Sequence, residues 1–184
     1  MHEKRFDGSP DKLRSENRLA ILEVNRVIDL SLEGIEAASM LDVGTGSGLF
    51  AERFQTHGLQ VAGVDVSQEM LDVASQHVPS ASLRLGTAEK LPFGDDFCDL
   101  VFMGLVLHET DAPLQALKEA RRVGRLRTAV LEWYYAADQA FGPPLEHRLS
   151  GERIRELSEQ AGFGKFSKHA LSNLVLYLLD VGLD

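Results

Sequence analysis

One stretch of sequence decides the fold of this chain: Met40-Leu41-Asp42-Val43-Gly44-Thr45-Gly46-Ser47-Gly48. Its first half is typical of a buried β-strand, and its second half is a glycine-rich turn. Glycine permits a positive φ and carries no Cβ that would block close approach. The helix expected to follow directs its free amide groups and the positive end of its dipole at the turn. The stretch therefore predicts a place where a ligand, in particular an anionic group, lies against bare backbone.

Strand-like and helical segments alternate after this stretch, which indicates a parallel sheet with helices on both faces. We expect an α/β three-layer sandwich in a single domain, residues 1–184. Within it, residues 1–35 form an N-terminal helical lid segment and residues 36–184 form the α/β core. The expected helices cover residues 10–32, 49–57, 68–77, 111–123 and 150–161. Further strands are expected at residues 59–66, 83–86, 98–107 and 127–133, with two more within 165–181.

Composition excludes several classes of protein. The chain has 184 residues, of which 44% are hydrophobic and 26% charged, and no apolar run reaches the roughly 20 residues that span a bilayer. The formal net charge of -9 would repel a phosphate backbone, so nucleic acid is not an expected partner. A polar N-terminus without a signal-like apolar segment, together with the single Cys98, favours a cytoplasmic location.

An acidic residue follows the glycine turn at a spacing in the sequence that indicates a ligand-binding role. Asp65 lies 21 residues beyond Gly44 and ends the expected second strand. At this position a carboxylate accepts hydrogen bonds from both hydroxyls of a ribose, which indicates a nucleoside ligand. Capping of the next helix is the alternative role for Asp65. A nicotinamide cofactor also stays possible, although Leu49 stands where a dinucleotide fold carries its third glycine.

Four motifs occur in order along the middle of the chain. They are Leu41-Asp42-Val43-Gly44-Thr45-Gly46-Ser47-Gly48, Val64-Asp65-Val66-Ser67, Gly86-Thr87-Ala88-Glu89 and Phe97-Cys98-Asp99-Leu100-Val101 leading to Leu107-His108-Glu109. With them the chain resembles the class I S-adenosylmethionine-dependent methyltransferases, in particular the small ones of ubiquinone and menaquinone biosynthesis and their unassigned bacterial relatives. This resemblance implies a Rossmann-like, seven-stranded, mostly parallel sheet whose last strand is antiparallel.

The resemblance also implies S-adenosylmethionine as the cofactor and S-adenosylhomocysteine as its product. Gly44 and Gly46 would pass close to the methionine part, with Asp42 orienting the turn, and Asp65 would hold the ribose hydroxyls. The residues implied around the adenine and on the floor of the site are Val66, Met70, Thr87, Ala88, Glu89, Met103 and Leu105. Thr87 departs from the family pattern, which often has an aspartate there, and a hydroxyl accepts a hydrogen bond more weakly than a carboxylate.

The candidate catalytic residues are His108 and Glu109, which follow the fourth strand where a methyl acceptor would approach. A histidine titrates near neutral pH and can accept a proton, whereas the alternative is a structural histidine or a wall of the pocket. For Glu109 the alternative is helix capping. The segments 132–135 and 142–148 either frame the acceptor site or form a rigid connection. No metal is expected, because the six histidines show no ligand spacing and the lone cysteine has no partner.

The function that these features favour is S-adenosylmethionine-dependent methylation of an unidentified small molecule. Two alternatives remain, a nicotinamide-dependent oxidoreductase and a non-catalytic module that binds S-adenosylmethionine. The sequence predicts a small-molecule methyl acceptor as the partner, no membrane span, and no particular oligomeric state.

Overall fold

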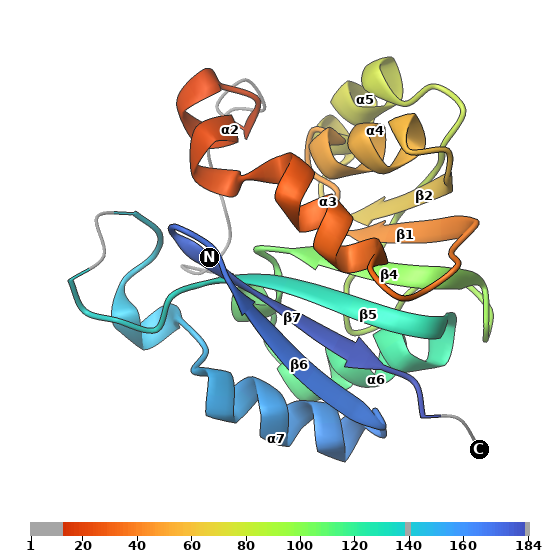
Figure 1. Cartoon of the computed structure of the whole chain (residues 1–184). Coiled ribbons are helices and arrows are strands. Elements are labelled where there is room, and N and C mark those ends of the chain that lie inside the picture. Colours follow the sequence, from red (N-terminus) through yellow and green to blue (C-terminus); the bar gives the residue numbers. More distant parts are fainter. Residues whose placement is uncertain (1–12, 139–140, 183–184) are drawn as a thin grey trace.

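The structure is a computed structural model that describes residues 13–138 and 141–182. Within these residues, seven strands form one sheet in the order β3-β2-β1-β4-β5-β7-β6 (Figure 1). Their bounds are β1 Ser39–Val43, β2 Gln60–Asp65, β3 Ser82–Leu85, β4 Cys98–Gly104, β5 Gly124–Trp133, β6 Lys165–Ala170 and β7 Leu174–Asp180. Strands β1 to β5 pair in parallel, and β7 is antiparallel to both β5 and β6. This confirms the predicted sheet, including its antiparallel last strand.

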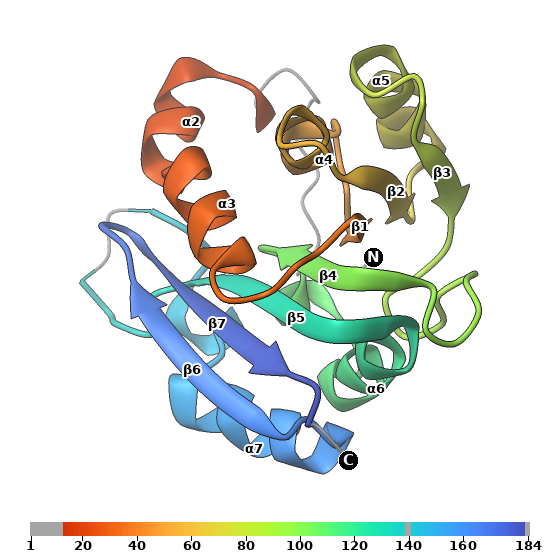
Figure 2. The same cartoon turned by 45° about the vertical axis from the view of Figure 1, so that its right-hand side comes forward.

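Helices cover both faces of the sheet, as predicted. The helical elements are α2 Glu16–Leu22, α3 Val24–Leu32, α4 Leu49–Thr56, α5 Gln68–His77, η1 Leu107–Glu109, α6 Pro113–Val123, η2 Leu145–His147 and α7 Gly151–Ala161. Helices α3, α4 and α5 lie on one face, and α6 and α7 on the other (Figures 1 and 2). Along the described parts of the chain, no helix is both long and apolar enough to cross a membrane.

Each face of the sheet has its own apolar core. Under α3 and α4, the ring of Phe102 packs between Phe50 and Phe54, with ring centroids 4.6 and 5.3 Å apart. On the opposite face, α6 and α7 bury Leu117 and Ile154 against the sheet. These cores hold the strands in place, so that their carboxyl ends meet along one edge.

The expected helix over residues 10–32 differs from the structure. Residues 1–12 lie outside the described part, and the remainder is divided into α2 and α3 at Glu23, whose φ is 47°. The carboxylate of Glu23 accepts hydrogen bonds from the backbone amide of Ser172 at 2.6 Å and from Arg26 at 3.2 Å. A contact with a distant part of the chain therefore accompanies the break, which helical periodicity does not reveal.

Two strand ends also differ from the prediction. Strand β4 ends at Gly104, and β5 begins at Gly124, without a loop after α6.

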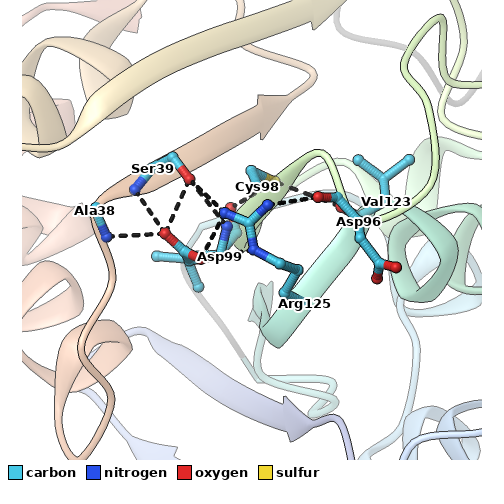
Figure 3. Close-up of polar contacts among 8 residues, drawn as sticks. Ala38, Ser39, Asp96, Cys98, Asp99, Val123 and Arg125 are labelled. Atoms are coloured by element: carbon cyan, nitrogen blue, oxygen red, sulfur yellow. Dashed lines mark hydrogen bonds and ion pairs between the residues drawn. The ribbon is translucent and has the colours of Figure 1, made fainter.

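A polar cluster joins β1, β4 and β5 at the amino edge of the sheet (Figure 3). One carboxylate oxygen of Asp99 accepts hydrogen bonds from the amides of Ala38 and Ser39 at 2.9 and 3.0 Å. Its other oxygen accepts from Nη2 of Arg125 at 2.7 Å. Burial by itself would raise the pKa of Asp99, but these hydrogen bonds outweigh it and hold the pKa below its ordinary value. The cluster thus ties together the starts of three strands whose opposite ends carry the glycine turn and His108.

We expect Asp99→Ala to lower the free energy of unfolding by about 2 kcal/mol, because the amides and the guanidinium lose their acceptor. The lowered pKa means that the carboxylate stabilises the fold above its ordinary pKa of about 3.9 and loses this effect as the pH falls through the folded value. The difference in free energy of unfolding between Asp99→Ala and wild type should therefore become smaller at acid pH. Urea unfolding at several pH values measures both effects, with the exposed Asp29→Asn as control. Equal stability of Asp99→Ala and wild type at pH 7 would contradict the role of the cluster.

Candidate active site

The glycine-rich turn joins β1 to α4 at the carboxyl edge of the sheet. Gly44, Gly46 and Gly48 have positive φ values of 69°, 52° and 77°. The amide of Gly44 donates to the carbonyl of Val64, 2.8 Å away, which ties the turn to β2. A Cβ on Gly44 would lie 2.6 Å from Cγ2 of Val106, so no side chain fits there without displacing the side chain of Val106. The bare backbone that the sequence predicts is thus required by both conformation and packing.

Two carboxylates hold this turn from different sides. Asp42 is 2% exposed, lies behind the turn and accepts a hydrogen bond from the hydroxyl of Thr45 at 2.8 Å. Burial raises the pKa of Asp42 to about 7, with a smaller contribution from the charge of Asp65. Asp65 stands at the end of β2, where it accepts hydrogen bonds from the amides of Gly46 and Ser67 at 2.8 and 2.9 Å. Asp65 therefore shapes the turn as well as bordering the space in front of it.

A cavity of about 930 Å³ lies over the turn, a volume typical of a small-molecule site. It is bounded by the ends of β1, β2 and β4, the start of α5, helix α2, η1 and the chain after β5. Most of the site residues indicated by the sequence line it: Gly44, Gly46, Asp65, Val66, Met70, Ala88, Glu89, Leu105, His108 and Glu109. The fold thus gathers these residues from four separate segments around one space.

Three of the indicated residues are not part of the lining. Asp42 lies behind the turn, in keeping with an orienting role. The backbone carbonyl of Thr87 accepts from the amide of Lys90 at 3.2 Å, and its hydroxyl does not border the cavity. Met103 is fully buried in the core under α6, because side chains alternate between the two faces of β4. The floor at this point is formed by Gly104, Leu105 and Val106 instead.

The chain leaves β4 through an unusual backbone conformation at Leu105. Its φ is 60°, in the left-handed region that costs a residue with a Cβ about 1–2 kcal/mol. The amide of Leu105 donates to the carbonyl of Leu131 in β5 at 2.9 Å, which holds the conformation in place. The chain then enters η1, where His108 and Glu109 reach the cavity. Backbone strain of this kind gathers at functional sites, and here it sets the direction of the segment that carries the candidate base.

His108 is paired with Glu132, a residue buried in β5. Nδ1 of His108 lies 2.7 Å from Oε2 of Glu132, and the amide of His108 donates to Oε1 of the same carboxylate at 3.0 Å. A carboxylate only accepts hydrogen bonds, so Nδ1 carries the proton. In the neutral imidazole, Nε2 is then the atom with a free electron pair, and it lies 3.9 Å from Oε1 of Glu109. The arrangement is that of a base whose tautomer and orientation are held by a buried carboxylate.

The surroundings of His108 favour its charged form. Burial by itself would lower the pKa of His108, but the charge of Glu132, its hydrogen bond and the charge of Glu109 outweigh burial, and the pKa is raised above its ordinary value. Arg148 acts in the opposite direction with a smaller effect. His108 therefore borders the cavity and has a pKa raised above its ordinary value.

Sequence reasoning placed Glu132 at the end of a strand but did not assign it to His108. The signal was available, since Glu132 is the only carboxylate in β5, directly follows the apolar run Ala129-Val130-Leu131, and is 1% exposed. Arg18 and Ile21 of α2 also line the cavity; they fall in the expected lid segment but were not named as site residues. The pair of His108 with Glu132 and the shared cavity both join segments that are far apart in the chain, so they become visible only in the folded molecule.

A metal ion and the Cys98 thiol are the remaining candidates for chemistry at the site, and the structure gives little support for either. In the ranges that the structure describes, no three His, Cys, Asp or Glu side chains gather closely enough to hold a metal ion. The Cys98 thiol is buried under α6 and donates to the carbonyl of Leu100 at 3.3 Å. Burial raises its pKa to about 12, so this thiol is not a nucleophile at neutral pH.

Known proteins share both the sequence and the architecture. Residues 41–127 match the methyltransferase domain family. An uncharacterised methyltransferase of Synechocystis is 31% identical over 175 residues, which cover 83% of this chain and 82% of that protein. Demethylmenaquinone methyltransferase of Chlorobaculum parvum is 37% identical over 93 residues, which cover 50% of this chain and 39% of that enzyme. The chain spans only 20% to 39% of the length of several curated relatives that it matches.

A solved structure supports the fold independently. A methyltransferase from Aquifex aeolicus described as dependent on S-adenosylmethionine superposes with a TM-score of 0.80 at 23% identity, over 96% of this chain and 100% of that one. Four observations indicate the same family. They are the order of the strands in the sheet, the glycine turn, Asp65 at the end of β2, and the sequence match that extends over most of the chain. The chain belongs to the class I S-adenosylmethionine-dependent methyltransferase family.

Proposed function

We propose that this protein transfers a methyl group from S-adenosylmethionine to a small molecule, with His108 accepting a proton from that molecule. The observation that carries the proposal is that the glycine turn, Asp65 and His108, which is paired with Glu132, border one and the same cavity. Family membership supports methyl transfer over the alternative of a nicotinamide-dependent oxidoreductase. Cytoplasmic location, a single domain over residues 1–184 and a small-molecule acceptor rather than nucleic acid belong to the same proposal.

The residues around the cavity fit the cofactor. Gly44 and Gly46 present backbone without side chains, suited to the methionine end, and the Asp65 carboxylate has lone pairs left for ribose hydroxyls. Val66 is 47% exposed although it is apolar, and it borders the cavity together with Met70. An adenine ring placed there would remove this apolar surface from water. Ala88, Glu89 and Leu105 complete the proposed cofactor end, whereas Thr87 and Met103 do not border it.

The N-terminal segment fits the proposed role of a lid in its described part. Leu13, Asn17, Arg18 and Ile21 border the cavity. Burial lowers the pKa of Arg18, and the charge of Glu109 acts against that change. Helix α2 thus brings a cation toward the η1 segment that carries His108. Phe6, which the sequence suggested as part of the closure, lies outside the described residues.

Asp65→Asn should weaken binding of S-adenosylhomocysteine about tenfold to a hundredfold, because it replaces hydrogen bonds to a charged acceptor, each contributing about 1.5–3 kcal/mol. Titration calorimetry measures the dissociation constant directly. The control is Asp72→Asn, which removes the same charge from the exposed side of α5. If the wild-type protein did not bind S-adenosylmethionine or S-adenosylhomocysteine, the proposed function would be lost.

The proposed chemistry assigns a distinct task to each residue of the pair. The bound cofactor supplies an electrophilic methyl group on a sulfonium. Glu132 keeps the Nδ1 proton of His108 in place, so that Nε2 can accept a proton from a hydroxyl or amine of the acceptor. Glu109, whose carboxylate lies 3.9 Å from Nε2, stabilises the imidazolium that results. An acceptor that must lose a proton therefore suits this site better than one that need not.

The rate of methyl transfer should rise with pH through an apparent pKa above about 6.5, because the base must be neutral and the pKa of His108 is raised. His108→Gln should lower the rate on the order of 10²–10⁴-fold and remove this dependence. Glu132→Gln should move the apparent pKa downward, since it removes the main charge that raises it. Transfer of a labelled methyl group to a panel of phenols, alcohols and amines provides the measurement, with the exposed His77→Gln as control.

Two results would oppose this assignment. An unchanged rate and pH profile in His108→Gln would exclude the proton-accepting role while leaving methyl transfer intact. Tight cofactor binding without turnover of any acceptor in the panel would favour the non-catalytic alternative.

A further inference from the structure

Arg148 is a buried arginine whose side-chain hydrogen bonds, among the residues that the structure describes, all go to backbone carbonyls. It is 9% exposed and directly follows η2. Its Nε donates to the carbonyl of Pro143 at 2.8 Å, and its Nη2 donates to that of Phe141 at 2.8 Å. Its Nη1 donates to the carbonyls of Tyr134 and Ala136 at 2.8 and 3.3 Å. One planar guanidinium thus joins the chain that leaves β5 to the chain that returns toward η2.

The returning chain forms one wall of the cavity. Phe141, Gly142, Pro143 and Pro144 border it, as does Trp133 at the end of β5. Gly142 has a φ of 93°, and a Cβ added to it would lie 2.6 Å from Cδ2 of Trp133. The backbone at Gly142 therefore lies directly on the indole ring. By holding the carbonyls on either side of this contact, Arg148 keeps the wall against Trp133.

The charge of Arg148 also reaches the proposed base. Its positive charge opposes the protonation of His108, whereas the carboxylates of Glu132 in β5 and Glu109 in η1 favour it. The other charged or titratable groups nearby are Arg18 of α2, which acts on Glu109, Tyr177 of β7, which interacts with Glu132, and His147 of η2, which borders the cavity. Burial raises the pKa of Tyr177 to about 12, so it stays neutral. Arg148 is thus a fixed cation whose charge opposes that of the two carboxylates around His108.

We infer that Arg148 is a positioning residue of the methyl-acceptor site, which fixes the wall made by residues 141–144 and sets the charge balance around His108. The inference rests on the proposed function for its kinetic consequences but not for its structural ones. Lysine cannot take over this role, because its single ammonium lacks the fork that reaches four carbonyls in different directions. The two contributions, geometry and charge, can therefore be separated by substitution.

Three variants make this separation. Arg148→Lys keeps the charge and loses the fork, and Arg148→Gln loses both. Gly142→Ala places a methyl group against Trp133 and leaves Arg148 in place. The matched control is Arg153→Gln, since Arg153 is half exposed on α7 and pairs only with its neighbour Glu156 among the contacts of its side chain that the structure describes.

The first measurement is the emission of Trp133, the only tryptophan in the chain. Both Arg148 variants and Gly142→Ala should shift its emission to longer wavelength and make it easier to quench with acrylamide, whereas Arg153→Gln should not. The second is the titration of His108 by NMR. Its pKa should rise in Arg148→Gln and stay near the wild-type value in Arg148→Lys and Gly142→Ala. Neither measurement requires cofactor or turnover, so both remain decisive if no methyl transfer is found.

The third measurement is kinetic. All three wall variants should raise KM for the acceptor on the order of tenfold to a hundredfold while binding S-adenosylhomocysteine as wild type does. Unchanged Trp133 emission in both Arg148 variants, or an unchanged pKa of His108 in Arg148→Gln, would overturn the inference. If Arg148→Gln does not fold, Arg148→Lys still decides whether the wall depends on the fork, and Gly142→Ala shows whether Trp133 emission reports displacement of the wall. Loss of cofactor binding in wild type would instead count against the proposed function.

Discussion

The space between Gly44 and Val106 is the constraint on which the rest of the site depends. A Cβ on Gly44 would lie 2.6 Å from the Val106 side chain, so the turn after β1 and the turn after β4 approach each other only because one of them has no side chain. These two strands are neighbours in the sheet although they are separated along the chain by two strands and two helices. Such a reversal of strand order opens a crevice at the carboxyl edge, which is where the cavity lies. One missing methyl group thus permits the close approach that brings the turn and η1 together.

The two edges of the sheet carry different kinds of interaction. At the amino edge, Asp99 and Arg125 join the starts of three strands, and Arg127 pairs with Asp180 while donating to the carbonyls of Ser31 and Glu33. These contacts satisfy charges and exposed backbone groups, and they hold the strands in register. The carboxyl edge instead contains glycines with positive φ, the unusual backbone of Leu105 and the buried His108–Glu132 pair. The costly backbone of Leu105 and the buried charges of His108 and Glu132 thus lie at the site, whereas hydrogen-bonded ion pairs stabilise the opposite edge.

Buried charge gives the site its chemical character. Glu132 is 1% exposed, and a carboxylate so far from water is costly unless hydrogen bonds and opposite charge surround it. His108 supplies both its imidazole and its backbone amide to this one carboxylate, and Arg148 adds a nearby positive charge. The same arrangement that makes burial of Glu132 tolerable orients Nε2 of His108. Stability and proposed function thus share one set of contacts here.

The sequence by itself determined the class of fold, the glycine turn and Asp65 at the end of β2, because these depend on local periodicity and on spacing along one βαβ unit. It also indicated His108 as a candidate, because this residue follows the fourth predicted strand. The division of the first helix at Glu23, the burial of Met103 and the pairing of His108 with Glu132 were decided by the tertiary structure. Each of them depends on which segments become neighbours across the sheet, as with Ser172 beside Glu23 or β5 beside η1. A local pattern specifies the direction of a side chain along its own element, but its partner is fixed only when distant elements pack together.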